Sequence, residues 1–354
     1  MQLGIIGMPS VGKTTIFELL INQRDKANSQ GKANSAIARI PDERIDRLSA
    51  IFKPKKTSYA QLELVDIPGL VPGQEKGSHV FLDSVRKADA LLHVVRLFQD
   101  ETIPYYYENI DPMRDIAMIS YELLLADLDL IEKRIERIHA SKKKNQMIKE
   151  LALLEQLKTT LEDEKPISSL QLDQEEQLIM STYQFLTSKP LLICLNLDDD
   201  DLISLDYPQK EAIADYSRLN DIPVVEVAGT IEKEIAELAE EEKEEFLKEM
   251  GIHESGLMKV SHSMYKRLGL ISFFTVGEDE VKAWTIEQGT PARKAAGKIH
   301  SDIERGFIRA EVVEYHDFIE LGSMNAVKEK GLFRLEGKEY VVKDGDIVHF
   351  RFNV

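Results

Sequence analysis

The residues with the most specific chemistry stand near the N-terminus. The octapeptide Gly7-Met8-Pro9-Ser10-Val11-Gly12-Lys13-Thr14 has the spacing G-x-x-x-x-G-K-[ST] of a phosphate-binding loop. Its two glycines let the backbone turn tightly, so successive N–H groups can point at phosphate oxygens. The helix that follows directs its positive end toward the same anion. The motif therefore predicts a site for a nucleoside triphosphate.

Several residues of this loop have predicted roles. Lys13 is expected to reach the β- and γ-phosphates, and the Thr14 hydroxyl to bind Mg²⁺. The predicted nucleotide contacts of the loop are Pro9, Ser10, Val11, Gly12, Lys13, Thr14 and Thr15.

A second motif, Asp66-Ile67-Pro68-Gly69, closes a later predicted strand. In this order after a phosphate-binding loop, Asp66 is expected to join Thr14 beside Mg²⁺, and Gly69 to lie near the γ-phosphate. The next residue is Leu70, whereas many GTPases have a glutamine there that orients the attacking water. An apolar side chain cannot position a nucleophile, so hydrolysis is slow or needs another group.

Selection of the base is expected at the end of a later strand. Asn196-Leu197-Asp198-Asp199 stands where a guanine-reading Asn-Lys-x-Asp would stand, with Asn196 and Asp199 kept and the lysine replaced by Leu197. We expect Leu197 to offer an apolar cover to either purine. The alternative is that residues 198–201 are only an acidic turn. Gly229 and Thr230 are the predicted second contact with the base.

The elements that must position these motifs alternate between strands and helices. Strands are predicted at the N-terminus before the loop and at 36–40, 61–67, 90–97, 190–196 and 222–227, with an acidic helix over 233–250. Such alternation indicates an α/β fold with a doubly wound parallel sheet, whose ligand site lies at the carboxyl ends of the strands.

The remaining segments differ in pattern from this sheet. Apolar residues at helical spacing over 112–161 predict two long helices joined near 141–145, an antiparallel hairpin inserted into the sheet domain. After 270 the pattern becomes short strands, predicted at 273–276, 283–286, 310–313, 339–342 and 347–352. The predicted domains are a nucleotide-binding domain (1–115 and 188–270), a helical hairpin (116–187) and an α+β domain (271–354).

Composition narrows the classes of partner. The formal net charge of the 354-residue chain is −17, which disfavours general coating of nucleic acid, and we expect neither DNA nor a membrane as partner. Local basic clusters leave a focused RNA contact open. One cysteine, Cys194, lies within an apolar run, and the N-terminus enters a strand directly, so we expect a cytoplasmic protein.

Over essentially its full length the chain resembles the YchF family of Obg-related P-loop proteins. Besides the phosphate-binding loop, the matching stretches are 40–44 (IPDER), 64–71 (LVDIPGLV), 93–96 (HVVR), 122–128 (ELLLADL), 282–286 (KAWTI), 296–300 (AGKIH), 306–310 (GFIRA) and 342–346 (VKDGD). The resemblance implies a P-loop domain with an inserted helical hairpin and a C-terminal TGS domain. It also implies cytoplasmic hydrolysis of ATP in preference to GTP, with Mg²⁺, and association with the ribosome.

The chain departs from the family pattern in two places. The family's switch I threonine segment has no clear counterpart in 25–38, where the equivalent register reads Ser29-Gln30-Gly31-Lys32. The family histidine implicated in hydrolysis corresponds to Tyr105. His79 is a candidate replacement for this histidine, and the alternative is that His79 is a solvated loop residue. No residue is assigned as the catalytic base, and Lys13 and Gly69 are expected only to contact the phosphates.

Three functions stay open at this point. The first is a slow ATPase that acts as a ribosome-associated switch in translation or stress, and contacts RNA or protein of the large subunit. The second is a nucleotide-binding module without hydrolysis, favoured by Leu70 and Tyr105. The third is a guanine-specific translation GTPase, in which Asp199 pairs with guanine. The predicted recognition surface consists of Trp284 and the C-terminal basic residues Lys282, Arg293, Lys294, Lys298, Arg305 and Arg309. The alternative is that these are ordinary surface charges and that Trp284 belongs to the core.

Overall fold

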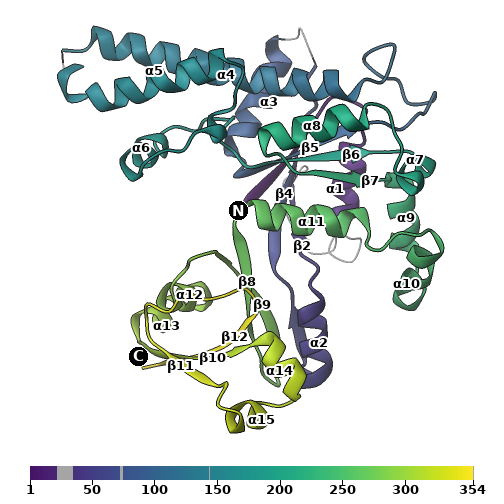
Figure 1. Cartoon of the computed structure of the whole chain (residues 1–354), viewed down its shortest axis with the longest axis vertical. Helices are drawn as coiled ribbons and strands as arrows, with labels where there is room; N and C mark the ends of the chain where they lie inside the picture. Colours follow the sequence, from purple (N-terminus) through teal and green to yellow (C-terminus); the bar gives the residue numbers. More distant parts are fainter. Residues whose placement is uncertain (22–34, 72–74, 143, 354) are drawn as a thin grey trace. The chain divides into compact units, whose positions relative to one another are not determined.

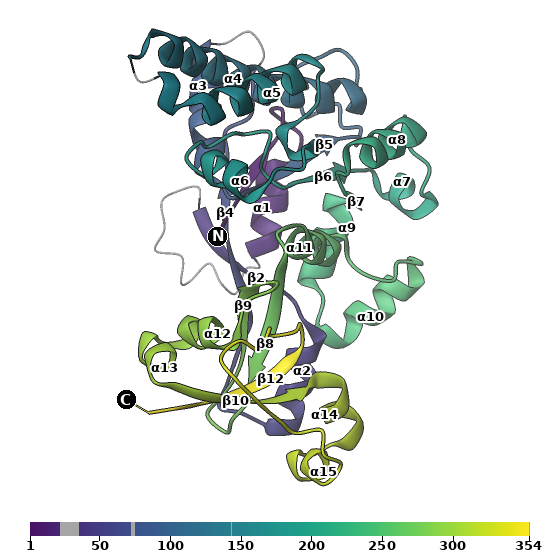
Figure 2. The same cartoon turned by 60° about the vertical axis from the view of Figure 1, so that its left-hand side comes forward.

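The computed structural model describes residues 1–21, 35–71, 75–142 and 144–353, which form two compact units. The first unit consists of Met1–Ile37 and Glu63–Val260, and the second of Ala38–Leu62 and Ser261–Val354. Figures 1 and 2 show the elements of both units. Each unit has a sheet and an apolar core of its own, and each is described by itself.

The first unit contains the sheet that carries the phosphate-binding loop. Its described strands have the order β2-β4-β1-β5-β6-β7, and the pairs β1–β4, β1–β5, β5–β6 and β6–β7 are parallel. The strands are β1 Gln2–Ile6, β2 Ser35–Arg39, β4 Gln61–Asp66, β5 Ala90–Arg96, β6 Leu191–Asn196 and β7 Val224–Val227. Every residue of β5 is buried, as expected for a central strand covered on both faces. The predicted doubly wound sheet is confirmed.

Helices connect these strands or follow the last of them. They are α1 Lys13–Ile21, α3 Glu75–Lys87, α7 Asp199–Ser204, α8 Lys210–Asn220, α9 Gly229–Glu237, α10 Glu240–Glu249 and α11 Gly256–Arg267. The last of these, α11, continues past Val260 into the second unit. The single acidic helix predicted over 233–250 is wrong. The chain breaks at Leu238 and Ala239, whose ψ angles of 151° and 154° are extended, and it resumes as α10.

The helical hairpin consists of α4 Pro112–Ala140 and α5 Ile148–Glu162, followed by α6 Gln174–Met180, with short 3-10 turns at Lys144–Gln146 and Ile167–Ser169. Figure 1 shows α4 and α5 side by side in teal, and an Arg134–Glu150 ion pair of 2.8 Å joins them. The first half of α4 packs Ile119 into the core under the sheet, and its second half packs Ile131 against α5. One continuous helix therefore serves both cores, and the predicted boundary at residue 116 stays a prediction.

The second unit contains a mixed sheet of order β11-β10-β12-β8-β9-β3 among its described strands. These are β3 Lys56–Ser58, β8 Leu270–Thr275, β9 Glu280–Glu287, β10 Phe307–Glu314, β11 Arg334–Glu336 and β12 Asp346–Phe352. The strand predicted at 339–342 is reduced to a single antiparallel bridge between Val341 and Pro291, in which the Ala292 N–H donates to the Tyr340 carbonyl at 2.7 Å. The Asp346 carboxylate holds the segment that follows this bridge. It accepts hydrogen bonds from the Tyr340 hydroxyl at 2.8 Å and the Lys343 N–H at 2.9 Å.

Helices cover both faces of this second sheet. They are α2 Glu43–Phe52, α12 Ala292–Ile299, α13 Ser301–Arg305, α14 Tyr315–Leu321 and α15 Met324–Glu329. Successive side chains of a strand point to opposite faces. Phe273 accordingly packs in the core with α12, whereas Phe274 lies beside Tyr315 of α14.

Residues 38–62 group with this second unit, although we predicted all of 1–115 to lie in the nucleotide-binding domain. Phe52 of α2 stacks on Phe318 with ring centroids 5.3 Å apart. The Arg44 guanidinium lies 2.8 Å from the Asp344 carboxylate, and β3 extends the sheet beside β9. These contacts join residues more than 200 positions apart in the chain, and 300 positions apart for Arg44 and Asp344, a separation that local sequence patterns do not report.

Within the described ranges, no helix is long and apolar enough to cross a membrane.

Candidate nucleotide site

The phosphate-binding loop joins the end of β1 to the start of α1. Gly7 and Gly12 have φ angles of 145° and 93°, and Ser10 has 62°, all in the region that disfavours side chains. A Cβ at residue 7 would overlap the carbonyl oxygen of Val94 in the neighbouring strand. A Cβ at residue 12 would overlap the Asn196 amide. Glycine is therefore required at both positions by backbone angle and by close packing.

Three side chains donate hydrogen bonds to carbonyl groups of the loop. The Lys13 ammonium donates to the Met8 carbonyl at 2.7 Å, and the Asn196 amide donates to the Val11 carbonyl at 3.1 Å. A third donor, Arg96, reaches the Ser10 carbonyl at 3.2 Å. Because these carbonyls are already paired, the loop is ordered in a conformation suited to an anion.

Lys13 is nearly enclosed, with 8% of its surface exposed. Burial lowers its pKa to about 8, and the nearby Asp66 carboxylate opposes that shift. A Cβ built on Gly69 would lie 3.0 Å from the Lys13 ammonium and 2.8 Å from the Pro9 nitrogen. The D-x-x-G glycine thus lies directly against the phosphate-binding loop, and a larger residue there would displace it.

The two predicted metal ligands lie together. The Thr14 hydroxyl donates to the Asp66 carboxylate at 2.8 Å. Hydroxyl and carboxylate oxygens are ligands that Mg²⁺ accepts, and a phosphate-bound Mg²⁺ needs only one or two from the protein. The donor set fits that ion. No cluster of three or more His, Cys, Asp or Glu residues suited to a metal occurs in the described part of the chain.

Leu70 points into the protein. Its side chain is 1% exposed and belongs to a core cluster with Ile6, Ile67 and Phe81. Its N–H donates to the Gly7 carbonyl at 3.2 Å. The residue after the D-x-x-G motif therefore anchors this segment to the core and the loop, and its side chain is not available to a nucleophile.

The residues predicted to contact the base lie together at the ends of β6 and β7, with the exception of the Leu197 side chain. Asn196 is 4% exposed, and its amide oxygen accepts the Gly229 N–H at 3.2 Å, which joins the ends of β6 and β7. The Thr230 hydroxyl donates to the Asp199 carboxylate. Asp199 begins α7, so the acidic residues 199–201 form the first turn of a helix, where negative charge is favourable.

Leu197 lies differently from our expectation. It is 1% exposed and packs in a core cluster with Val95, Ile116 and Ile193. An apolar side chain at the end of a buried strand gains more from this core than from an open surface. Its side chain therefore does not form the predicted cover for a purine.

Two buried polar residues near the loop were not predicted as functional. His93 and Arg96 both lie on β5 and are 1% and 2% exposed. Burial, with the Lys13 charge as a smaller cause, lowers the pKa of His93 to about 3. Its Nε2 atom has no hydrogen-bond partner among the described residues. The available signal was the presence of two ionisable residues inside an otherwise apolar buried strand.

Comparison with known proteins places this geometry in a family. Residues 2–126 match a family model described as "50S ribosome-binding GTPase", and residues 270–353 match YchF-GTPase_C, described as "Protein of unknown function (DUF933)". The chain is 43% identical over 361 residues to the "Ribosome-binding ATPase YchF" of Bacillus subtilis (strain 168), covering 99% of each chain. The chain belongs to the YchF family. A YchF relative of the same name from Escherichia coli O157:H7 is 39% identical over 360 residues, again over 99% of each chain.

Comparison with solved structures also places the chain in the YchF family. The YchF GTPase structure of Schizosaccharomyces pombe has a TM-score of 0.89 to this chain at 32% identity, covering 99% of this chain and 97% of that one. The YchF architecture therefore extends over both compact units, and the predicted fold class is confirmed.

The structure shows the surroundings of two positions at which the sequence departs from the YchF pattern. His79 lies exposed on α3 and not in a loop. The Tyr105 hydroxyl donates to the Asp115 carboxylate, and burial raises its pKa. Tyr105 is thus engaged in the protein as a hydrogen-bond donor. The register Ser29-Gln30-Gly31-Lys32 that we compared with the family's switch I lies outside the described residues.

Proposed function

We propose that the chain binds ATP with Mg²⁺ and hydrolyses it slowly to ADP and phosphate. The observation that carries this proposal is the arrangement of Lys13, Thr14 and Asp66 in one loop-and-strand site. The lysine is buried beside the Asp66 carboxylate, whose oxygen lies 2.8 Å from the Thr14 hydroxyl. A cation for the phosphates and two oxygen ligands for Mg²⁺ are the protein groups that phosphoryl transfer requires at this position.

The preference for ATP over GTP rests on the base site. Guanine-specific proteins present a lysine stem over the base, and here that position is Leu197, buried in the core. The remaining acid, Asp199, already accepts a hydrogen bond from Thr230. Guanine would have to replace that bond, whereas adenine makes no such demand. The curated relatives are named ATPases, which supports the same choice.

A second candidate, binding without hydrolysis, is favoured by two observations. The Leu70 side chain is in the core, and the Tyr105 hydroxyl is bound to Asp115. Neither residue can accept a proton from water in this arrangement. We therefore expect the chemical step, rather than binding, to limit turnover.

We further propose that the protein associates with the large ribosomal subunit in the cytoplasm, as a switch in translation or stress. The relatives' name, ribosome-binding ATPase, and the match of residues 2–126 to a ribosome-binding GTPase family support this association. We propose that the second unit makes this contact and that its partner is RNA. This unit carries a basic region and no predicted catalytic residues, so its expected role is recognition.

Several of the basic residues in that region form ion pairs or hydrogen bonds within the second unit. Lys294 forms a 2.8 Å ion pair with Glu304, and the Arg293 Nε donates to the Glu304 carbonyl at 3.2 Å. Arg305 pairs with Asp302. These cations are already engaged with neighbours in the same unit, so they contribute little to the attraction of a phosphate.

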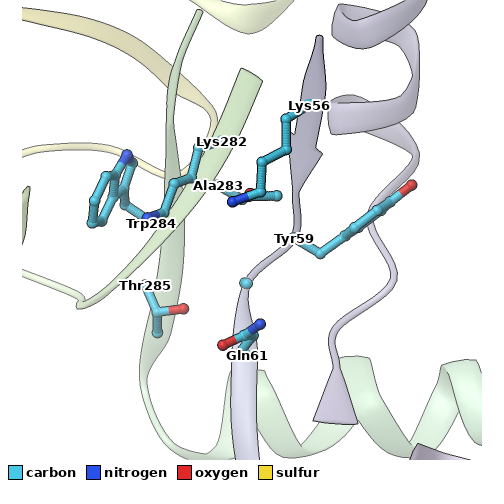
Figure 3. Close-up of a pocket in the computed structure, with 9 residues that line it drawn as sticks. Lys56, Tyr59, Gln61, Lys282, Ala283, Trp284 and Thr285 are labelled. Carbon is cyan, nitrogen blue, oxygen red and sulfur yellow. The ribbon is translucent and has the colours of Figure 1, made fainter. Parts of the chain in front are cut away.

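A pocket of about 360 Å³ offers a better place for RNA, at the point where β3 ends beside β9. Figure 3 shows Lys56 and Lys282 reaching toward it from neighbouring strands, with Gln61 and Thr285 at its lower edge. The Lys282 ammonium lies 3.7 Å from the Trp284 ring centroid. Lys56 also lies 3.3 Å from the Glu280 carboxylate, so Lys282 is the main cation that this pocket would offer to a phosphate.

The test is a single-turnover assay with ATP and GTP, each with and without ribosomes, on the native chain and on Lys13→Ala. We expect slow ATP cleavage that ribosomes accelerate and that Lys13→Ala abolishes. Tight ATP binding without cleavage would select the binding module, and faster GTP cleavage would select the GTPase. Co-sedimentation of Lys56→Glu/Lys282→Glu with ribosomes, compared with Lys294→Glu as a matched control, tests the RNA surface separately. Equal retention of both variants would exclude this pocket.

A further inference from the structure

Arg96 and Asn196 are neighbours in the sheet and bind successive carbonyls of the phosphate-binding loop. Arg96 is the last residue of β5, and it stands in register with Asn196, the last residue of β6. Arg96 Nη1 donates to the Ser10 carbonyl at 3.2 Å, and Asn196 Nδ2 donates to the Val11 carbonyl at 3.1 Å. Two adjacent strand ends thus hold two adjacent peptide groups of the loop.

The planarity of the peptide bond gives this contact a consequence for the nucleotide. In a trans peptide the C=O and the next N–H point in opposite directions. The Ser10 carbonyl points at Arg96, so the Val11 N–H points away from Arg96. Ser10 itself has φ 62°, a left-handed conformation that is unfavourable for a non-glycine residue and needs support from its surroundings.

The same guanidinium also holds the segment that follows β5. Its Nε donates to the Phe98 carbonyl at 3.1 Å, its Nη2 to the Asp100 carbonyl at 3.1 Å, and its Nη1 to the Ile103 carbonyl at 3.2 Å. The Phe98 ring lies 4.3 Å from its central carbon, which excludes water from one side. Only arginine has enough donors in a fixed plane to reach four carbonyls at once.

We propose that Arg96 is a positioning residue for nucleotide binding: it turns the Val11 N–H toward the phosphates and links the phosphate-binding loop to residues 98–103. The inference rests on the proposed nucleotide function of this site. Arg96 does not touch the base or the reacting atoms in this scheme. Its effect passes through the Ser10–Val11 peptide, so it must act on every nucleotide that carries a β-phosphate, whatever its base.

The direct test is nucleotide affinity of Arg96→Lys, measured by calorimetry with ATP, GTP and ADP. Lysine keeps the charge but reaches fewer carbonyls, so we expect all three affinities to fall together, by about 10- to 100-fold. Arg134→Lys is the matched control, because Arg134 is a partly buried arginine of the same unit that pairs with Glu150 on the hairpin. It should lose stability in urea without losing affinity.

A measurement on the native chain tests the link without any substitution. Hydrogen exchange followed by mass spectrometry should show ATP protecting residues 98–103 together with residues 8–12, while residues 148–162 are unchanged. Protection confined to residues 8–12 would overturn the link. Arg96→Lys that folds and binds all three nucleotides within about twofold of the native affinity would overturn the positioning role. If Lys13→Ala also binds normally, the proposed nucleotide site itself is refuted, so the two failures are distinguishable.

Discussion

Replacement of Gly12 by alanine should damage the site through Asn196. The new Cβ would overlap the Asn196 Nδ2 atom, which donates to the Val11 carbonyl. The same amide accepts the Gly229 N–H through its oxygen. Because Asn196 is only 4% exposed, it cannot move into solvent, and one or both hydrogen bonds must break.

The magnitude has two parts. Alanine at φ 93° is strained by about 1–2 kcal/mol, independent of any contact. Displacement of the Asn196 amide adds about 1 kcal/mol for each of two hydrogen bonds, and more if a buried group stays unpaired. The free energy of unfolding should therefore fall by about 3–4 kcal/mol in total.

A matched control separates these parts. Gly251 belongs to the same unit and has φ 70°, but a Cβ there would meet nothing within 4 Å. Gly251→Ala should lose only the strain, about 1–2 kcal/mol, and should bind ATP normally. Urea unfolding gives both stabilities, and calorimetry gives both affinities.

The reasoning also predicts coupling between the two residues. In Gly12→Ala/Asn196→Ala the overlap is gone, so the double variant should be less destabilised than the sum of the single variants by about 1–2 kcal/mol. Additive losses, or a Gly12→Ala variant no less stable than Gly251→Ala, would refute the contact as the cause.

Four further outcomes are expected. Lys13→Ala should weaken triphosphate binding by about 2–5 kcal/mol at an unchanged melting temperature, measured by calorimetry and circular dichroism; native affinity would contradict the phosphate role. Because the pKa of Lys13 is about 8 without ligand and phosphate favours the charged form, ATP binding should take up a proton near that pH and weaken as pH rises from 7 to 9. Calorimetry in buffers of different ionisation enthalpy detects that uptake, which Lys13→Ala should lose. For His93, whose folded pKa is about 3, the unfolded chain takes up a proton below about 6.5. Its contribution to stability is therefore complete above that pH and is lost toward pH 3, by up to about 1.4 kcal/mol per unit, and His93→Gln should flatten the profile in urea unfolding. Leu197→Lys should lower stability by about 2–5 kcal/mol, because the side chain is in the core, and a well-folded variant that prefers GTP would show instead that residue 197 reaches the base.

Much of the site was predictable because its motifs are local. The loop between β1 and α1 requires glycine at positions whose backbone angles are set within a few residues, and Lys13 and Thr14 follow at fixed spacing. The pairing of Thr14 with Asp66 was also within reach, because parallel strands place their carboxyl ends at one edge of a sheet. The apolar run of β5 was sufficient to predict a central buried strand.

Other features depended on contacts between distant segments. Leu197 was predicted from its motif to face a base, but the core formed with Val95 and Ile116 decides its orientation. Residues 38–62 follow a strand of the first sheet in sequence, yet the Arg44–Asp344 pair and the Phe52–Phe318 stack place them in the second unit. A periodic pattern reports only that a helix has an apolar face, and the partner of that face is chosen during folding.

By itself, then, the amino-acid sequence determined a P-loop nucleotide site on a doubly wound sheet, because the backbone geometry of that loop is specified by glycines and a lysine within eight positions. Only the tertiary structure decided what supports the loop. Arg96 and Asn196 are a hundred residues apart in sequence, and they become neighbours through the pairing of β5 with β6. Hydrogen bonds to the Ser10 and Val11 carbonyls follow from that register, since a donor must lie within about 3.5 Å of its acceptor and sequence spacing alone does not set that distance.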